Sequence, residues 1–298
     1  MDMDDGKMRN LRLRSELFRA IRDCFYRAGY LEVETPVKIH APAPEEYIES
    51  VQAEKDFLRT SPELAMKVLL ADGMEKIFQI GPCFRANESG RRHREEFTML
   101  EYYSRGTGYR ELAEFTAGFV AEAAERVLGS TRIEYGGKQI DLSAYEFVTV
   151  DDAFRLHAGC TASEADALDR FDELMVTKIE PELGNGKLTF LCDYPANRAS
   201  LARLRADDPS VAERWELYIA GIELANAFGE LTDAKEQRER FQAALKFRAA
   251  AGMHTYPEPV EFFAALERGL PESSGSAMGL DRLTMVMCGA TDIADVRA

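Results

Sequence analysis

The sequence predicts an α+β fold in which a mostly antiparallel sheet is flanked by helices. Segments typical of strands come in neighbouring pairs and do not alternate strictly with helices, which favours an antiparallel sheet over a doubly wound parallel one. Of the 298 residues, 46% are hydrophobic and 30% are charged, as in a globular chain that buries a core. Because neither a repeat nor a linker-like stretch divides the chain, we expect one domain with an insertion at about residues 107–210.

Local patterns predict the elements of the first half, because apolar residues recur at helical spacing or alternate as in a strand. In order, these are a helix at Leu11–Phe25 that Gly29 ends, a strand at 30–36 that Pro36 ends, a helix at Leu64–Leu70, a strand at 77–80 broken at Gly81-Pro82, a strand at 97–103, a helix at Tyr109–Leu128 and a Gly-Gly hairpin at 133–140. The very polar segment between the strands at 77–80 and 97–103 predicts a long hairpin loop.

The second half begins with a mixed, largely helical insertion. Its predicted elements are that insertion at 146–185, a strand at Leu188–Leu191, a strand at Glu216–Leu224, a helix at Ala234–Ala251, a helix at Glu261–Arg268, a Gly/Ser segment and a last helix from Asp281.

Charge and composition exclude several classes of protein. The formal net charge of −15 excludes a generally basic surface for nucleic acid, although a local basic patch stays possible. No run of about 18 apolar residues could span a membrane, and the acidic Met1–Asp5 segment does not resemble a secretory signal. The five cysteines lie far apart and form no C-x-x-C pair, which predicts reduced thiols in a cytoplasmic protein without a zinc site.

The segment Phe84–Phe97 is unusually rich in cations for an acidic chain. It contains four arginines and His93, one of only four histidines. A cluster of fixed donors suits a polyanion such as a triphosphate. A solvated hairpin loop of mixed charge explains the same residues equally well.

The segment Ser274–Leu283 places small residues at every second position. One face of a strand is then bare, so a flat ligand or a phosphate can approach the backbone closely. Arg282 follows at the start of the last predicted helix. Gly/Ser runs are more often simple turns, so this segment does not by itself define a site.

The mostly apolar segment that predicts the strand at Glu216–Leu224 contains two glutamates. A carboxylate inside a strand is costly unless it meets a metal ion or a cation. Glu216 and Glu223 are seven positions apart, an odd number, so a regular strand would place them on opposite faces. A bulge or bend at Gly221 is therefore needed for them to share a metal. The alternative is that both are charges at a sheet edge.

Taken together, these segments resemble the class II aminoacyl-tRNA synthetases of the lysyl type in order, spacing and residue type. The matching motifs are Thr35-Pro36 for the first motif at the dimer interface, Phe84-Arg85 through His93 to Glu96-Phe97 for the second, Gly275-x-Ala277-x-Gly279-x-Asp281-Arg282 for the third, and Ser61-Pro62-Glu63 with Gly221-x-Glu223-x-x-Asn226-x-x-x-Glu230 for the lysyl subgroup. The resemblance extends from about residue 8 to the end of the chain. It implies the class II catalytic fold and a homodimer.

Three features resemble one branch of the family more closely. We expect no anticodon-binding domain before the matched segment, Ser61 stands where lysyl-tRNA synthetases usually have alanine, and Ala277 stands where they usually have glycine. The branch with these features consists of truncated paralogues that join (R)-β-lysine to a lysine of elongation factor P. The resemblance therefore implies an ATP-dependent ligase that makes an aminoacyl-adenylate and has a protein acceptor instead of a tRNA, and the acidic charge agrees.

The resemblance also implies roles for individual residues. The set implied for ATP is Arg85, Asn87, Glu88, His93, Phe97 and Arg282, of which Arg85 and Arg282 are the catalytic pair. The set implied for Mg²⁺ is Glu216 and Glu223, and the set implied for the amino acid is Ser61, Glu63, Glu101, Tyr103, Asn226, Glu230 and Ala277. A substrate with two ammonium groups needs carboxylates at two ends. We expect Glu63 to meet the backbone-like amine, and Glu101 and Glu230 to meet the side-chain amine.

The chain departs from the family at the second motif. Asn87 occupies the position of a usual glutamate, and Arg94-Glu95 replaces a usual Asn-Pro pair. Two alternative functions therefore stay open. The protein could activate α-lysine for a tRNA or another protein, or it could be a catalytically weakened paralogue that binds a ligand as a regulator.

Overall fold

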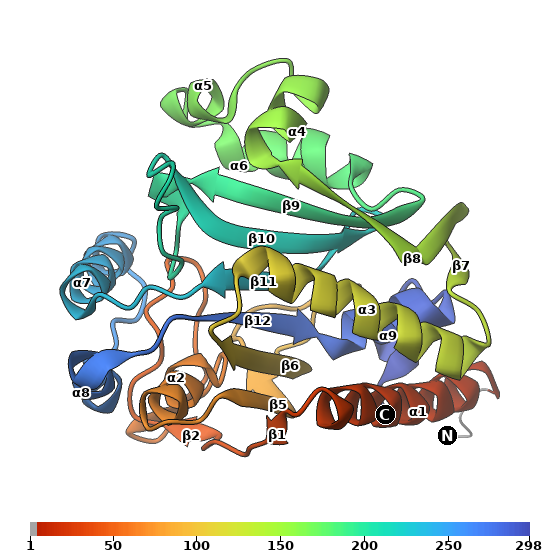
Figure 1. Ribbon diagram of the computed structural model, residues 1–298, viewed down its shortest axis with the longest axis horizontal. Helices are drawn as coiled ribbons and strands as arrows, with labels where there is room; N and C mark the ends of the chain where they lie inside the picture. Colours follow the sequence, from red (N-terminus) through yellow and green to blue (C-terminus); the bar gives the residue numbers. More distant parts are fainter. Residues whose placement is uncertain (1–4) are drawn as a thin grey trace.

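A nine-stranded sheet forms the centre of the computed structural model, which describes residues 5–298 (Figure 1). Its strand order is β1-β5-β6-β12-β11-β10-β9-β8-β7, and a small second sheet has the order β2-β4-β3. Met1–Asp4, on which part of the expectation about a secretory signal depends, lie outside the described residues. No helix in the described part of the chain is both long and apolar enough to cross a membrane.

The helices and strands follow the predicted order closely. The helices are α1 Asp5–Arg27, α2 Glu63–Ala71, α3 Tyr109–Leu128, α4 Val150–His157, α5 Ala162–Ala167, α6 Phe171–Leu174, α7 Ala234–Ala250, α8 Val260–Gly269 and α9 Leu280–Cys288, with short helical turns at Met175–Ile179, Glu180–Glu182, Ala196–Arg198 and Ile293–Val296. The strands are β1 Leu31–Glu32, β2 Lys38–Ile39, β3 Gln52–Ala53, β4 Asp56–Leu58, β5 Lys76–Phe84, β6 Glu96–Arg105, β7 Arg132–Tyr135, β8 Lys138–Thr149, β9 Lys187–Pro195, β10 Val211–Ile219, β11 Ile222–Gly229 and β12 Ser273–Gly279.

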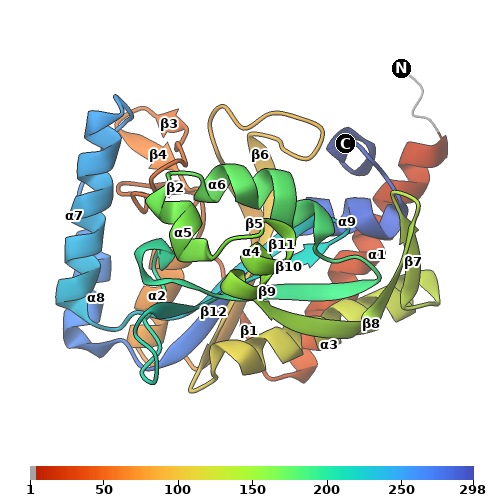
Figure 2. The same ribbon diagram turned by 90° about the horizontal axis from the view of Figure 1, so that it is seen from above.

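The predicted α+β class with a mostly antiparallel sheet is confirmed. Within the described residues, only the pairs β1–β5 and β8–β9 of the large sheet are parallel. Helices α1 and α3 pack on one another and cover one face of the sheet (Figures 1 and 2). Their apolar stripes, including Leu17, Phe25 and Val120, join Leu100 and Trp215 of the sheet in the main core. The opposite face is left for the site described below.

Two predicted strand boundaries are wrong at β5 and β1. Strand β5 continues through Gly81-Pro82, where a break is expected from the sequence. The Pro82 carbonyl accepts a hydrogen bond from Arg59 Nε at 2.9 Å, so this residue directs its backbone groups away from β6 and the missing N–H costs no ladder bond. Strand β1 is only Leu31–Glu32, because the Thr35 N–H donates to the Gln79 side chain at 2.9 Å instead of to a strand.

The predicted single strand at Glu216–Leu224 is a hairpin instead. Ala220 and Gly221 have φ values of 50° and 73°, as a tight two-residue turn between β10 and β11 requires. The pairing shifts register between Leu217 and Tyr218, so Leu224 is an extra residue in β11. The bend expected at Gly221 is therefore present as a turn, and a bulge follows it.

Candidate active site

The candidate site lies on the sheet face opposite α1 and α3, where side chains of four neighbouring strands meet. The strand register aligns Glu101 of β6, Ala277 of β12, Asn226 of β11 and Glu216 of β10 in a single row. Successive side chains of a strand point to opposite faces, so the neighbouring Leu100 belongs to the core. Antiparallel pairing thus gathers residues that are far apart in the sequence.

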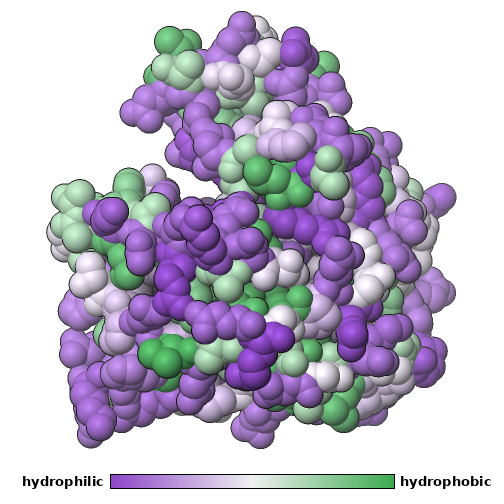
Figure 3. Space-filling model, turned by 60° about the vertical axis from the view of Figure 1, so that its left-hand side comes forward, coloured by the Kyte–Doolittle hydropathy of each residue, from purple (hydrophilic) through white to green (hydrophobic). Residues whose placement is uncertain are grey.

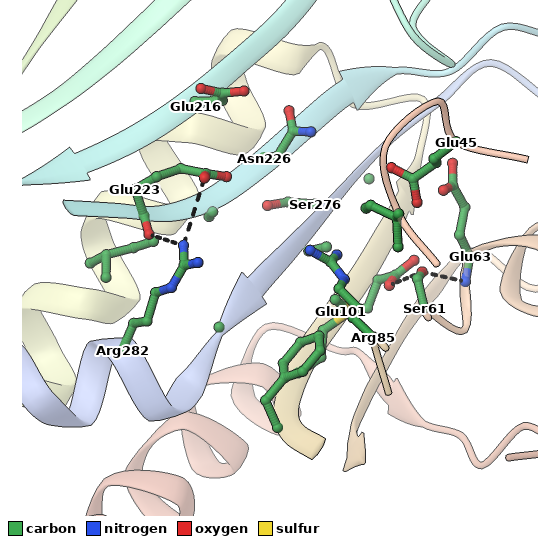
Figure 4. Close-up of a pocket in the computed structure, with 18 of the residues that line it drawn as sticks. Glu45, Ser61, Glu63, Arg85, Glu101, Glu216, Glu223, Asn226, Ser276 and Arg282 are labelled. Atoms are coloured by element: carbon green, nitrogen blue, oxygen red, sulfur yellow. Dashed lines mark hydrogen bonds and ion pairs between the residues drawn. The ribbon is translucent and has the colours of Figure 1, made fainter. Parts of the chain in front are cut away.

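One pocket, with a volume of about 300 Å³, is lined by all but one of the candidate residues. Those it brings together are Ser61, Glu63, Arg85, Glu88, His93, Phe97, Glu101, Tyr103, Glu216, Glu223, Asn226, Glu230, Ala277 and Arg282. Figure 4 shows Arg282 and Glu223 on one side, Glu45 and Glu63 on the other, and Arg85 between them.

The bare strand face predicted from the small residues is confirmed at Gly275 of β12. A Cβ at this position would lie 2.1 Å from a ring carbon of Tyr103 and 2.8 Å from Glu230 Oε1. Neither neighbour can retreat easily, because both are almost fully buried. Gly275 therefore lets Tyr103 and Glu230 reach the pocket together.

Glu101 is held at the bottom of the pocket by two hydroxyl groups. Ser61 donates to Glu101 Oε2 at 2.7 Å, and Tyr103 donates to Glu101 Oε1 at 2.6 Å. The Ser61 hydroxyl also accepts the Glu63 N–H at 2.9 Å, which ties it to the start of α2. Burial, together with the nearby charge of Glu63, raises the pKa of Glu101 to about 8 despite these donors. A cationic ligand would stabilise the ionised form.

Two further carboxylates share one buried lysine. The Lys67 ammonium lies 2.6 Å from Glu63 Oε1 and also pairs with Glu230. Burial opposes the charge on Lys67, but Glu230 and Glu63 together raise its pKa. Burial also raises the pKa of Glu230, although Lys67 lowers it, and Glu230 Oε1 has no hydrogen-bond partner in the described part of the chain. The carboxyl groups of Glu63, Glu101 and Glu230 thus outnumber the one ammonium group of Lys67, so a positively charged ligand could pair with the remaining negative charge.

We predict that the stability of the ligand-free protein falls as the pH rises from about 6.5 to about 8.5. The pKa values of Glu101, at about 8, and Glu223, at about 7, lie above their unfolded-state values, so the folded protein binds more protons than the unfolded chain in this range. Each such group contributes a slope of at most about 1.4 kcal/mol per pH unit. Urea unfolding at several pH values measures the slope.

The matched variant for this prediction is Glu101→Gln, which removes one of the titrating groups. We expect a shallower slope for it, mainly below about pH 8, where the folded carboxyl group still holds its proton and the unfolded one is already ionised. His93 has the opposite sign, because its pKa is lowered by burial and by Arg282, but it acts only below about pH 6.5. A stability that rises across the tested range would contradict the prediction.

The other end of the pocket carries the cationic groups. The Arg85 guanidinium lies 5.2 Å from the centre of the Phe97 ring, and its buried Nε has no partner among residues 5–298. Arg282 Nη1 donates to the Glu223 carbonyl at 2.8 Å, and Arg282 Nη2 contacts His93 Nε2. The lowered pKa of His93 keeps the imidazole neutral, so it can accept this hydrogen bond. These groups form a fixed set of donors facing the pocket.

Glu216 and Glu223 reach the same face because of the bulge at Leu224. Glu216 pairs with Asn226 across the hairpin and Glu223 pairs with Tyr218, so one extra residue in β11 puts all their side chains on one side. Burial and the charge of Glu216 raise the pKa of Glu223 to about 7. Nowhere in residues 5–298 do three or more His, Cys, Asp or Glu side chains form a metal-binding group. The pair nevertheless fits Mg²⁺, which is commonly held by one or two carboxylates together with substrate phosphates.

Asn87 is the one candidate that the structure does not bring to the pocket. Its φ is 65°, in the left-handed region, and its N–H donates to Glu95 Oε1 at 2.9 Å. This turn places Glu88 on the pocket wall, while Asn87 is absent from it. The placement of Asn87 in the ATP set therefore finds no support in the geometry.

Sequence reasoning missed three charged residues at the site. Lys67 follows Glu63 by four residues on α2, and this spacing could have revealed the pair. Arg214 precedes Glu216 by two residues on β10, so it shares its face, and it donates to Glu216 Oε1 at 2.6 Å. Glu45 lies on the loop between β2 and β3, where no periodic pattern could have placed it.

Comparison with known proteins identifies the family. The model of the class II tRNA synthetases (D, K and N) matches residues 1–298. An elongation factor P–(R)-β-lysine ligase from Proteus mirabilis is 39% identical over 97% of this chain and 94% of its own length, and one from Pectobacterium atrosepticum is also 39% identical over the same shares. A lysine–tRNA ligase from Xanthomonas oryzae is 34% identical over 95% of this chain but only 61% of its own length. The chain therefore belongs to the class II tRNA synthetase family of the D, K and N type.

Proposed function

We propose that the protein activates (R)-β-lysine with ATP and transfers it to a lysine of elongation factor P. In the first step the substrate carboxylate attacks the α-phosphorus of ATP, a phosphorus–oxygen bond forms, and pyrophosphate leaves. In the second step the lysine amine attacks the acyl carbon of the adenylate, an amide bond forms, and AMP leaves. The relatives named for this activity match the chain over nearly its whole length, which supports the proposal.

The observation that carries the proposal is the carboxyl cluster at the closed end of the pocket. Glu63, Glu101 and Glu230 are all at least nine-tenths buried, and among residues 5–298 Lys67 is the one cation that forms an ion pair with any of them, namely with Glu63 and Glu230. Such an excess of buried acid is costly unless a ligand supplies positive charge. A diamine amino acid supplies two ammonium groups, whereas an acidic amino acid would be repelled. The site therefore favours a lysine-like substrate.

The opposite end of the pocket suits the nucleotide. We propose that Arg85 binds the α-phosphate and stabilises the charge that develops there during attack. Arg282 and Phe97 would enclose the adenine, because a guanidinium plane and an aromatic ring are both good stacking partners for a base. Glu88 and His93 would approach the outer phosphates. Members of this family generally use ATP and Mg²⁺, and Glu216 with Glu223 would hold Mg²⁺, which neutralises phosphate charge when bound.

The oligomer and domain arrangement are part of the same proposal. We propose that residues 1–298 act as one catalytic domain with an insertion at about 107–210, and that two chains form a homodimer through α1 and β1. Tyr26 of α1 and Leu31 of β1 are 51% and 55% exposed, which is high for large apolar side chains beside a core. A second copy of the chain would cover them.

The proposed function predicts a mass increase of elongation factor P equal to one β-lysyl group. Elongation factor P is incubated with the protein, ATP, Mg²⁺ and either (R)-β-lysine or α-lysine, and intact mass spectrometry gives the product. ATP–pyrophosphate exchange with each isomer measures the first step separately. A strong preference for α-lysine would favour the alternative suggested by the lysine–tRNA ligase relative. ATP binding without exchange for any isomer would favour a regulatory role instead.

A further inference from the structure

A second cavity, of about 670 Å³, opens beside the active-site pocket. It lies between the loop that joins β2 to β3, helix α7, and the segment from α6 to Leu201. Figure 3 shows the side of the molecule where a notch separates the upper lobe from the body. Glu45, Arg214, Glu216 and Glu223 line both this cavity and the active-site pocket, so the two are continuous. We call this second cavity the side groove.

The walls of the side groove are partly apolar and exposed. Tyr47 and Val176, which both line the groove, are 70% and 60% exposed, respectively, and the buried side chains of Phe171 and Phe241 also line it. The Tyr47 ring packs edge-on against Phe247 of α7, with 5.4 Å between ring centres. A groove of this kind is shaped for a polypeptide segment more than for a small polar ligand.

The unbalanced charge of the side groove is negative. Its arginines are already paired: Arg198 contacts Asp166 and Asp172, Arg214 contacts Glu216, and Arg240 contacts Glu236. By contrast, within residues 5–298 no ion pair reaches the carboxylates of the groove-lining residues Glu45, Glu46 and Glu180. The groove is therefore complementary to a positively charged segment.

Glu45 lies at the junction of the two cavities and is held there by a buried arginine. Arg248 of α7 is fully buried, and it donates to the Glu45 carbonyl at 2.5 Å and to the Ile48 carbonyl at 2.7 Å. It also pairs with Glu49 at 2.9 Å. The loop backbone is thus fixed, while no hydrogen bond from the described residues reaches the Glu45 carboxylate. Figure 4 shows this carboxylate beside that of Glu63.

We propose that the side groove binds a positively charged segment of the protein acceptor that carries the lysine to be modified, and that Glu45 pairs with the ε-ammonium of this lysine. The inference rests on the proposed function, because it names where the second substrate enters. Amide formation joins Nζ to the acyl carbon and breaks the bond from that carbon to the AMP phosphate oxygen, whose electron pair leaves with AMP. Two protons leave the nitrogen, the first to Glu45 and the second to water.

The variant Glu45→Gln tests the inference, with Glu182→Gln as its matched control on the exposed surface. In Glu45→Gln, we expect kcat/KM for elongation factor P to fall by about 10- to 100-fold, as expected for loss of a charged hydrogen bond, and ATP–pyrophosphate exchange with (R)-β-lysine to fall by much less. Hydroxylamine, a small neutral nucleophile, should still trap the adenylate that the variant forms. Exchange and transfer that fall together would overturn the inference, since Glu45 would then bind the first substrate.

A second pair of variants tests the groove itself. Val176→Arg adds a positive charge inside the side groove, and Leu156→Arg adds the same charge to an apolar residue that is 75% exposed on α4, outside the groove. We expect Val176→Arg to raise KM for elongation factor P by at least about tenfold, because like charges would meet. Equal effects of the two variants would overturn the groove assignment. Absence of exchange in the unaltered protein would instead reject the proposed function.

Discussion

Replacement of Arg85 by alanine is expected to lower kcat/KM for adenylate formation by about 10²- to 10³-fold, the usual cost of removing one preorganised transition-state donor. Arg85 lies in the middle of the pocket, between the carboxyl cluster and the pair of Arg282 and Glu223. Its guanidinium rests on Phe97 and its Nε has no partner within residues 5–298, so it is oriented but not neutralised. The Arg85 guanidinium is therefore already positioned to stabilise the negative charge that develops on the α-phosphate during attack.

The measurement is ATP–pyrophosphate exchange at saturating and at limiting (R)-β-lysine, and Arg91→Ala is the matched control. Arg91 belongs to the same loop and is exposed, but it does not line the pocket. We expect Arg85→Lys to recover only part of the activity, because an ammonium cannot form the planar pair of contacts of a guanidinium. A loss in Arg91→Ala as large as that in Arg85→Ala would show that general loop charge, not this contact, matters.

The sequence predicted most of the fold because its signals are local. The helix at Tyr109–Leu128 has the predicted bounds, since its apolar periodicity lies within the segment itself and the αL residue Gly129 follows it directly. The predicted strand boundaries are wrong where a side chain from a distant part of the sequence determines them. Arg59 accommodates Pro82 within β5, and Gln79 takes the Thr35 N–H that would otherwise extend β1. Neither partner can be read from the residues next to the strand.

The candidate site was predicted to a similar extent and for a similar reason. The motifs identified residues such as Glu101 and Ala277 as members of the site, but only the strand register shows that these two residues are adjacent. The bulge at Leu224, which brings Glu223 and Asn226 to one face, has no sequence signal of its own. Glu45 was missed because its position depends on Arg248, far along the chain. Long-range polar contacts therefore limit what a single sequence reveals here.

Replacement of Lys67 by methionine is expected to destabilise the protein by about 3–5 kcal/mol near pH 8, the usual cost of leaving buried charges without their partner. Lys67 is 1% exposed and is the cation that contacts both Glu63 and Glu230. Methionine keeps most of the side-chain volume, so the loss reports on charge and not on a cavity. Urea unfolding monitored by circular dichroism gives the free energy of unfolding.

The pH dependence of this loss separates an electrostatic cause from a packing cause. Burial already raises the pKa of Glu230 and Lys67 opposes this shift, so without Lys67 the pKa of Glu230 should rise further above its unfolded-state value, and this carboxyl group takes up a proton in the folded protein as the pH falls. The destabilisation should therefore be smaller near pH 6 than near pH 8. The double variant Lys67→Met with Glu230→Gln should recover part of the loss, and the exposed Lys55→Met is the matched control. A loss that is equal at both pH values and unchanged in the double variant would mean that Lys67 acts through packing, and that the carboxyl cluster does not carry the excess negative charge on which recognition of a diamine depends.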